Sequence, residues 1–406
     1  MATAATDAAL ERRLGELLAR RSEANRRYFE AEATRFAALC HRMAERFARG
    51  GRLLAIGDSP SARSDARHVA VEFVHPVIVG KRALPAIALA GEGGSLESRV
   101  AGVAGPEDMA IAFGAGEDLG STAVALARER GCLTIAFAPA GAEWELEPPE
   151  TDPFVRQELV ETAYHVLWEL VHVFFEHRGL LAGRAAAPLH DAGAAGFLYP
   201  FLSEGERDLD AVVEDVRRSA LAKSVEVGAL REQTLEENRD ALIAAAAAIR
   251  RSFEAGGSLL AFGNGGSATD AMDLVADLRA APQGWPERRA IDLTEDPSIL
   301  TAIANDVGVE EIFQRQLIAH GREGDVAVAL STSGNSLNLI EALAEARHRR
   351  LQTVAFVGDD GGRIAAGGLA DHVIITRSQH IPRIQEAQAS AYHVLRELIE
   401  LVGPEA

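Results

Sequence analysis

Short apolar runs alternate along the chain with longer segments in which apolar residues recur every three or four positions. Such runs are typical of buried strands, and the longer segments are typical of amphipathic helices, so the pattern predicts parallel sheets with crossover helices. In the second half of the chain, strands are expected at 258–263, 289–294, 326–331, 353–358 and 372–376. In the first half they are expected at 52–57, 85–90, 109–114, 133–138 and 144–146. A long helix, at about 8–49 and about 209–255, should precede each group.

The two halves repeat one another in the same order. The run GRLLAIG at 51–57 corresponds to GSLLAFG at 257–263, and QELVETAYHVLWEL from Gln157 corresponds to QEAQASAYHVLREL from Gln385. A repeat of this length indicates a duplicated domain. We therefore expect an α/β protein with two tandem domains, each a five-stranded parallel sheet flanked by helices in a flavodoxin-like three-layer arrangement. The domains should span 1–178 and 209–406, with a Gly-, Ala- and Pro-rich linker at 179–208.

Composition narrows the class of protein. Hydrophobic residues make up 48% of the 406 residues, which is enough for two cores. A net charge of -19 disfavours wrapping by nucleic acid. Only Cys40 and Cys132 are present, which excludes a disulfide framework and a cysteine-built zinc site. The N-terminus lacks the pattern of a secretory signal, and no apolar run is long enough to span a bilayer. We expect a cytoplasmic protein with neither nucleic acid nor membrane as a partner.

Two loops of the second copy carry the pattern of an anion site. GNGGSATDA (263–271) follows the first predicted strand, and STSGNS (331–336) follows the third. Ligands of open parallel sheets bind beyond the carboxyl ends of the strands, where glycines expose backbone N–H groups and hydroxyls donate hydrogen bonds. The corresponding loops of the first copy, 57–65 and 114–121, contain Pro60, Glu117 and Asp118. We expect the first copy to bind phosphate poorly.

These loops, together with AIAND (302–306), GREGDV (321–326) and RIQE (383–386), resemble the phosphoheptose (sedoheptulose-7-phosphate) isomerases of the SIS domain superfamily. The resemblance covers 209–402, and residues 30–178 resemble the same domain in degenerate form. It implies two tandem SIS domains, an aldose–ketose isomerase of a phosphorylated sugar, sites at subunit interfaces, and no nucleotide cofactor. The substrate-binding positions that it implies are Asn264, Gly265, Gly266, Ser267, Asp306, Ser331, Thr332, Ser333, Ser336 and Gln385.

Aldose–ketose isomerisation moves a proton between adjacent carbons through an enediol, and it needs a base and an acid or metal. The resemblance implies a glutamate and a histidine for this chemistry, and zinc bound by His, Glu, Gln and His. The second copy has Asp273, Asp277, Gln385 and His393 at these positions, with Asp277 and His393 as the catalytic pair. Aspartate shortens the reach of the carboxylate by about 1 Å, which can lower a rate roughly a hundredfold.

The first copy retains the histidine and the glutamate that the second copy has replaced with aspartates. With one inserted residue, the metal-binding positions fall on His68, Glu72, Gln157 and His165, with Glu72 and His165 as the catalytic pair. We hypothesise a composite site that combines the phosphate loops of the second copy with the His/Glu groups of the first. Eight residues of helix span about 12 Å, so Gln157 and His165 cannot easily reach one ion from a single straight helix. Either the helix begins after Gln157, or the two side chains serve different sites.

Two interpretations of the function stay open. The first is an isomerase that converts sedoheptulose 7-phosphate, or another sugar phosphate, to its aldose. The second is a non-catalytic sugar-phosphate-binding regulator or protein scaffold of the same superfamily. Retention of His165 and His393 favours the enzyme, whereas Asp273 and Asp277 favour the binding protein. Because one chain holds two copies, a homodimer of chains would reproduce a four-domain assembly.

Overall fold

The computed structural model describes residues 2–78, 81–91, 94–114, 121–176, 208–282 and 284–401, which form two compact units. Unit 1 consists of Met1–Glu23, Pro153–Val155 and Glu226–Ala406, and unit 2 of Ala24–Asp152 and Arg156–Val225. Almost all of the expected linker, and Glu117 and Asp118 of the expected first-copy loop, lie outside the described residues.

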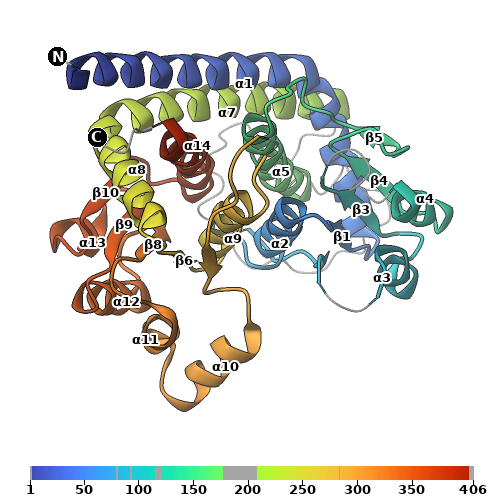
Figure 1. Ribbon diagram of the computed structural model, residues 1–406. Helices are drawn as coiled ribbons and strands as arrows, with labels where there is room; N and C mark the ends of the chain where they lie inside the picture. Colours follow the sequence, from blue (N-terminus) through green and yellow to red (C-terminus); the bar gives the residue numbers. More distant parts are fainter. Residues whose placement is uncertain are drawn as a thin grey trace. The chain divides into compact units, whose positions relative to one another are not determined.

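Unit 2 is built on a five-stranded parallel sheet in the order β2-β1-β3-β4-β5. Helices lie along the sheet, as the blue and green ribbons of Figure 1 show. The strands are β1 (Leu53–Ile56), β2 (Ala86–Leu89), β3 (Met109–Ala112), β4 (Leu133–Ala136) and β5 (Trp144–Glu145). The helices are α2 (Pro60–Val74), α3 (Leu96–Val103), α4 (Ser121–Glu129) and parts of α1 (Ala2–Ala48), α5 (Pro153–Glu176) and α7 (Leu209–Glu237).

Unit 1 repeats this topology, with a parallel sheet in the order β10-β9-β8-β6-β7 (Figure 1). The strands are β6 (Leu259–Gly263), β7 (Ala290–Asp292), β8 (Val326–Ser331), β9 (Gln352–Gly358) and β10 (His372–Thr376). The helices include α8 (Arg239–Glu254), α9 (Gly266–Arg279), α10 (Pro297–Asp306), α11 (Gln314–His320), α12 (Leu337–His348), α13 (Gly362–Ala366) and α14 (Ile381–Leu401). Each sheet has the order 2-1-3-4-5 when its strands are counted from its own first strand, which confirms the predicted flavodoxin-like class.

The core of unit 1 lies on both faces of its sheet. Val326, Val328 and Leu330 of β8 belong to a buried cluster with residues of α8, α9 and α14. Ala327 and Ala329, which alternate with them, belong to a second cluster with residues of α11 and α12. Successive side chains of a strand point to opposite faces, so β8 is buried on both sides. This is the reason why its sequence is a continuous apolar run.

The long helix expected at about 209–255 is instead two helices, α7 and α8, separated at Asn238. Asn238 has φ -105° and ψ 15°, outside the helical region. Its side-chain amide donates to the carbonyl oxygen of Ile375 (2.9 Å) and accepts from the N–H of Ile375 (2.8 Å). Asn238 therefore pairs with the edge strand β10 much as another strand would, and the helix is interrupted where it does so.

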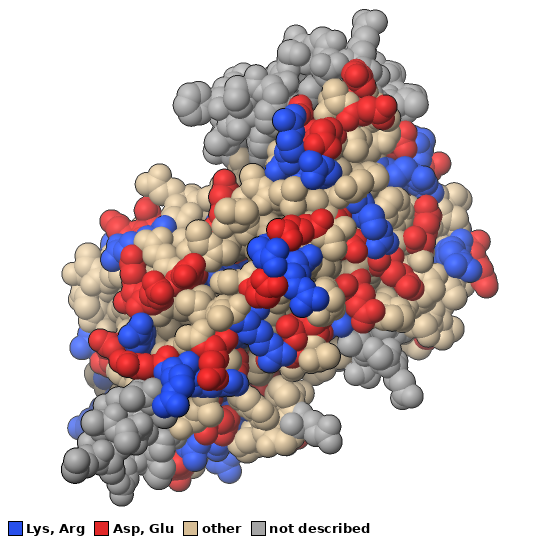
Figure 2. All heavy atoms as spheres, turned by 90° about the horizontal axis from the view of Figure 1, so that it is seen from above, with Lys and Arg blue, Asp and Glu red and all other residues tan. Residues whose placement is uncertain are grey.

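Two surface properties bear on the expected partners. Within the described ranges, every helix is too short or too polar to cross a bilayer. Figure 2 shows acidic and basic side chains interspersed over one face. The excess negative charge of the chain therefore does not form a single acidic field on this face.

Candidate active site

The first candidate loop follows β6, at the point where the strand order of unit 1 reverses. β6 pairs with both β7 and β8, so the loops after β6 and β8 leave neighbouring strand ends. Gly265 has φ +59° and ψ -127°, a conformation that only glycine adopts readily. Asn264 and Gly265 are exposed, Gly266 begins α9, and Ser267 is buried in its first turn. This places exposed backbone at the N-terminus of a helix, where anions are favoured.

The second candidate loop follows β8. The buried Ser331 Oγ accepts hydrogen bonds from the N–H groups of Gly334 (3.0 Å) and Ser333 (3.3 Å), so this hydroxyl braces the loop from within. Gly334 has φ +61°, and a Cβ there would clash with the carbonyl oxygen of Gly361. Ser333 is exposed, and Thr332 and Ser336 are partly exposed. A ligand can therefore reach the hydroxyls of Thr332, Ser333 and Ser336.

Two residues that the sequence analysis did not identify hold these loops in place. The side chains of Asn264 and Asn338 exchange hydrogen bonds at 3.0 and 2.9 Å, and Gln388 Nε2 donates to the carbonyl oxygen of Ser331 at 3.1 Å. Asp306, which the resemblance places near the sugar, is the exposed last residue of α10 and accepts a hydrogen bond from Asn305.

A buried group of unit 1 consists of Asp273 and Asp277 on α9 and His393 on α14. The two aspartates are four residues apart and share one face of the helix. His393 Nε2 lies 3.4 Å from Oδ2 of each aspartate. The hydroxyl of Tyr392 donates to Oδ2 of Asp273 at 2.9 Å. The resemblance to the phosphoheptose isomerases had implied three of these four residues, all except Tyr392.

The surroundings of this first triad are buried and aromatic. Burial, and next the neighbouring carboxylate of Asp273, raise the pKa of Asp277 above its ordinary value. The ring of Phe154 stacks on the imidazole of His393 with centroids 5.0 Å apart, and Trp285 meets Phe154 edge-on. Phe154 belongs to the short segment Pro153–Val155 of unit 1. A carboxyl group whose pKa is raised toward neutral pH, beside an imidazole, is suited to proton transfer.

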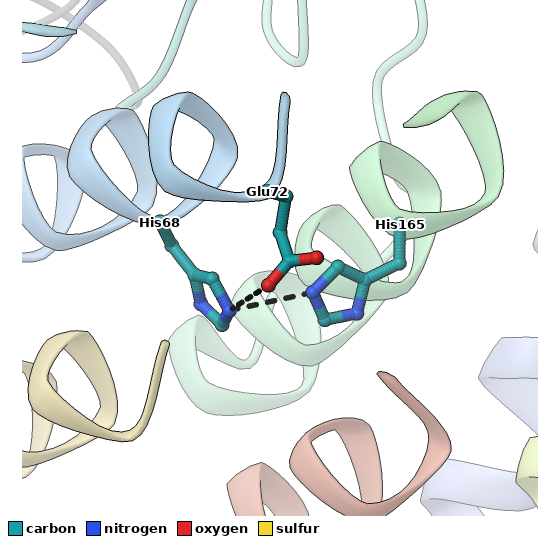
Figure 3. A group of neighbouring side chains, drawn as sticks. All are labelled: His68, Glu72 and His165. Atoms are coloured by element: carbon teal, nitrogen blue, oxygen red, sulfur yellow. Dashed lines mark hydrogen bonds and ion pairs between the residues drawn. The ribbon is translucent and has the colours of Figure 1, made fainter. Parts of the chain in front are cut away.

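A second buried triad lies in unit 2, where His68 and Glu72 of α2 and His165 of α5 point toward one another (Figure 3). His68 Nε2 lies 3.9 Å from Glu72 Oε1 and 3.4 Å from His165 Nε2. The hydroxyl of Tyr164 is 3.0 Å from Nδ1 of His68. Burial, and next the neighbouring His165, hold the pKa of His68 well below its ordinary value, so this imidazole is neutral at pH 7.

Both triads fit a divalent metal ion by donor type. In each, three side-chain atoms lie within 4.8 Å of one another, with two imidazoles and one carboxylate in unit 2 and one imidazole and two carboxylates in unit 1. Catalytic zinc sites use three such protein ligands and leave one position open. A neutral His68 offers the electron pair that a metal requires.

The two glutamines of the implied metal set lie on the same helices as the histidines, nearer to the start of each helix. Gln157 is inside α5, which begins at Pro153, and Gln385 is inside α14, which begins at Ile381. The alternative in which the helix begins after Gln157 is therefore wrong. Each glutamine precedes its histidine by eight residues of helix, about 12 Å along the axis.

Sequence reasoning missed Tyr164, Tyr392 and Glu161. Glu161 is buried, with a carboxylate oxygen within 4.8 Å of a ring nitrogen of His68. For the tyrosines a signal was present, because AYHVL occurs at 163–167 and again at 391–395. An identical Tyr-His pair in two diverged copies, on helices buried along most of their length, indicates a shared contact of the hydroxyl.

Comparison with known proteins by sequence matches part of the chain, and comparison by fold aligns almost all of it. The SIS domain model matches residues 225–358. The phosphoheptose isomerase of Thermodesulfovibrio yellowstonii is 39% identical over 189 residues, which are 46% of this chain and 92% of the relative. That of Paramagnetospirillum magneticum is 42% identical over 187 residues, 43% of this chain and 96% of the relative. The C-terminal domain of glucosamine-fructose-6-phosphate aminotransferase from Francisella tularensis aligns with 95% of this chain and 94% of its own length, at a TM-score of 0.54 and 10% identity, a likeness of fold.

Proposed function

This chain belongs to the phosphoheptose isomerase family of SIS-domain proteins, and from that premise we propose that it is an aldose–ketose isomerase of a phosphorylated sugar. The observation that carries the proposal is the pair of buried triads, each with an imidazole and at least one carboxylate around a common point. The serine loop of unit 1 supplies the phosphate grip. We take sedoheptulose 7-phosphate as the substrate, because the relatives that match most of their length are phosphoheptose isomerases.

In this proposal the reaction divides into anchoring and proton transfer. Thr332, Ser333 and Ser336, with the N–H groups around Gly265, hold the phosphate by hydrogen bonds without a cationic side chain. A carboxylate takes the proton from the carbon beside the carbonyl group, and the same group returns it to the neighbouring carbon of the enediol. An imidazole donates a proton to one oxygen of the enediol and removes a proton from the other. Asp277 and His393 have these roles in unit 1, and Glu72 and His165 in unit 2.

Each triad would act either as this acid–base pair or as a metal site, because a carboxylate or imidazole that is bound to a metal through the same atom is not free to accept a proton. The metal would be zinc, held by His68, Glu72 and His165 in unit 2 and by Asp273, Asp277 and His393 in unit 1. When bound, a zinc ion polarises the carbonyl oxygen of the substrate. Burial of all six side chains excludes water, which strengthens their electrostatic effect on the substrate. The glutamines Gln157 and Gln385 are assigned here to substrate or to a neighbouring site, because their distance along the helix separates them from the histidines.

A turnover assay on three variants tests the function. His393→Ala and the double variant His68→Ala/Glu72→Ala should each lower kcat for sedoheptulose 7-phosphate at least about a hundredfold, since general acid–base catalysis contributes that much. His348→Ala is the matched control, because its imidazole is exposed on α12. If only His393→Ala loses turnover, catalysis belongs to unit 1 alone. If both active-site variants keep the rate of the wild type, the proposal is wrong.

A non-catalytic sugar-phosphate-binding protein is the second candidate. It is favoured by one observation: both aspartates of unit 1 stand where the family has a histidine and a longer glutamate, and both face His393 at 3.4 Å. Calorimetry with sedoheptulose 7-phosphate separates the two functions. Binding of the sugar phosphate by a wild-type protein that shows no turnover of several ketose phosphates would identify the binding protein.

A further inference from the structure

In each triad, a tyrosine hydroxyl lies within hydrogen-bond distance of the residue that comes first in the chain. Tyr164 and Tyr392 immediately precede His165 and His393 in the chain. The Tyr164 hydroxyl is 3.0 Å from Nδ1 of His68, and the Tyr392 hydroxyl is 2.9 Å from Oδ2 of Asp273. Both tyrosines are 1% exposed. The two copies have diverged at the partner, a histidine in one and an aspartate in the other, and have kept the hydroxyl.

The hydroxyl can have opposite roles in the two units, because the tautomer of His68 decides the direction of its bond to Tyr164. In unit 1, the Tyr392 hydroxyl donates to Oδ2 of Asp273. In unit 2, His68 turns Nε2 toward Glu72 at 3.9 Å and His165 at 3.4 Å, and it turns Nδ1 toward Tyr164. When Nε2 offers its electron pair to a ligand, the ring proton is on Nδ1, and the Tyr164 oxygen accepts it. A hydroxyl can do both, because it has one proton and two lone pairs.

We propose that Tyr164 and Tyr392 are positioning residues of the two triads. Tyr164 selects the Nδ1-protonated tautomer of His68 and so presents Nε2 to the triad, and Tyr392 fixes the Oδ2 atom of Asp273 in the orientation that faces His393. This inference rests on the proposed function only because it takes the two triads as the functional groups of the protein. Partners of this kind fix tautomer and orientation in metal sites, and their removal typically lowers affinity for the metal 10- to 100-fold.

The ring contacts of the two tyrosines do not require the hydroxyl that both copies carry. The Tyr164 ring meets His68 and His165 edge-on at centroid distances of 5.4 and 5.0 Å, and the Tyr392 ring meets His393 at 4.6 Å. Phenylalanine would preserve all three ring contacts and remove only the oxygen. Tyr→Phe variants therefore isolate the hydroxyl. Tyr28→Phe is a matched control, because Tyr28 is also fully buried and its hydroxyl donates to the carbonyl oxygen of Leu146 at 2.7 Å, a backbone acceptor.

The first experiment reads the tautomer directly and needs neither metal nor substrate. Imidazole ¹⁵N chemical shifts of His68 are measured in full-length protein stripped of metal, with His68→Gln used to assign the signals. We expect the Nδ1-protonated form in the wild type and in Tyr28→Phe, and a shift toward the Nε2-protonated form in Tyr164→Phe. An Nε2-protonated His68 in the wild type, or an unchanged spectrum in Tyr164→Phe, would overturn the assignment for Tyr164.

The second experiment titrates the stripped protein with Co²⁺ and follows its d–d absorption. Tyr164→Phe is made in an Asp273→Asn/Asp277→Asn background, and Tyr392→Phe in a His68→Ala/Glu72→Ala background, so that one triad is read at a time. Each should weaken Co²⁺ binding at least about tenfold. Equal weakening by Tyr28→Phe, or unchanged binding in both variants, contradicts the proposal. If the Tyr→Phe variants change the His68 tautomer and Co²⁺ binding as expected but the wild type has no isomerase activity, the proposed function is refuted. The assignment of the tyrosines would still stand.

Discussion

Asn264 and Asn338 exchange two hydrogen bonds, amide to amide, at 3.0 and 2.9 Å. Asn264 is in the loop after β6, and Asn338 is in the first turn of α12, after the serine loop. The pair thus ties together the two loops that the proposed function assigns to phosphate. Since each amide has a donor and an acceptor, neither can be replaced by a carboxylate without loss of one bond.

Asn338→Asp should weaken phosphate binding. The carboxylate loses the bond to Asn264 Oδ1 and places a negative charge behind the loops. We expect the Kd for inorganic phosphate to rise at least about tenfold, equivalent to about 1.4 kcal/mol, as measured by calorimetry. Gln352→Glu makes the same change of amide to carboxylate at the exposed start of β9, the opposite end of the sheet. Equal effects of the two variants would indicate net charge alone rather than the amide pair.

Gly334→Ala should abolish phosphate binding while leaving unit 2 folded. Alanine at φ +61° is strained, and its Cβ would clash with the carbonyl oxygen of Gly361, so the serine loop must move. We expect loss of the calorimetric phosphate signal and a lower melting temperature. Gly368→Ala is the control, because its φ is +55° and a Cβ there meets open space. If Gly334→Ala bound phosphate as tightly as Gly368→Ala, the serine loop would not be the phosphate site.

Lys223→Met should destabilise the protein strongly. Lys223 of α7 forms a buried ion pair with Glu169 of α5 in unit 2. Removing one member of a buried pair leaves an uncompensated charge, at a cost of roughly 3–5 kcal/mol. The double variant Lys223→Met/Glu169→Leu should recover most of this loss, because neither charge then remains buried. Urea unfolding of the single and double variants measures the difference, and a double variant as unstable as Lys223→Met would contradict the interpretation.

His172 should make the protein less stable as the pH falls. Burial, and next the nearby Lys81, lower the pKa of His172 to about 4. The unfolded chain, in which the imidazole has an ordinary pKa near 6.5, therefore binds more protons than the folded chain between pH 6.5 and 4. Stability contributed by neutral His172 is complete above this window and is lost on acidification through it.

The variant His172→Gln removes the titration and keeps a donor for the carbonyl oxygen of Arg82. Between pH 7 and 4.5, we expect wild type to lose roughly 2–3 kcal/mol more stability than this variant, measured by urea unfolding at each pH. His348→Gln, at an exposed histidine, should follow the wild type. Parallel pH curves for wild type and His172→Gln would show that His172 does not couple folding to protonation.

The strands could be predicted from the sequence because burial on both faces leaves a simple apolar pattern. The expected strands at 326–331 and 372–376 coincide with β8 and β10. The interruption of the helix at Asn238 could not be predicted, since an asparagine inside a helical pattern does not reveal that its partner is Ile375, distant in sequence. The internal repeat predicted that both halves share one topology. It did not show which strands are neighbours in each sheet, which the structure gives.

The candidate site was predictable where spacing along one helix decides the geometry. Four-residue spacing placed Asp273 beside Asp277 and His68 beside Glu72. Contacts between elements distant in sequence were beyond such reasoning, so the hydroxyls of Tyr164 and Tyr392 and the amides of Asn338 and Gln388 were missed. Their roles depend on the packing of helices against other helices, strands and loops, which no local pattern encodes.

The leading halves of α1 and α7 make the two copies interdependent. Leu10, Leu14 and Leu17 of α1 are part of the core of unit 1, where Arg21 also pairs with the buried Glu397 at 3.1 Å. The leading half of α7, up to Val225, belongs in turn to unit 2. A gene truncated between the repeats would encode two fragments, each missing a piece of its own hydrophobic interior. Each copy therefore completes its hydrophobic interior with a helical segment that precedes the strands of the other copy in the chain.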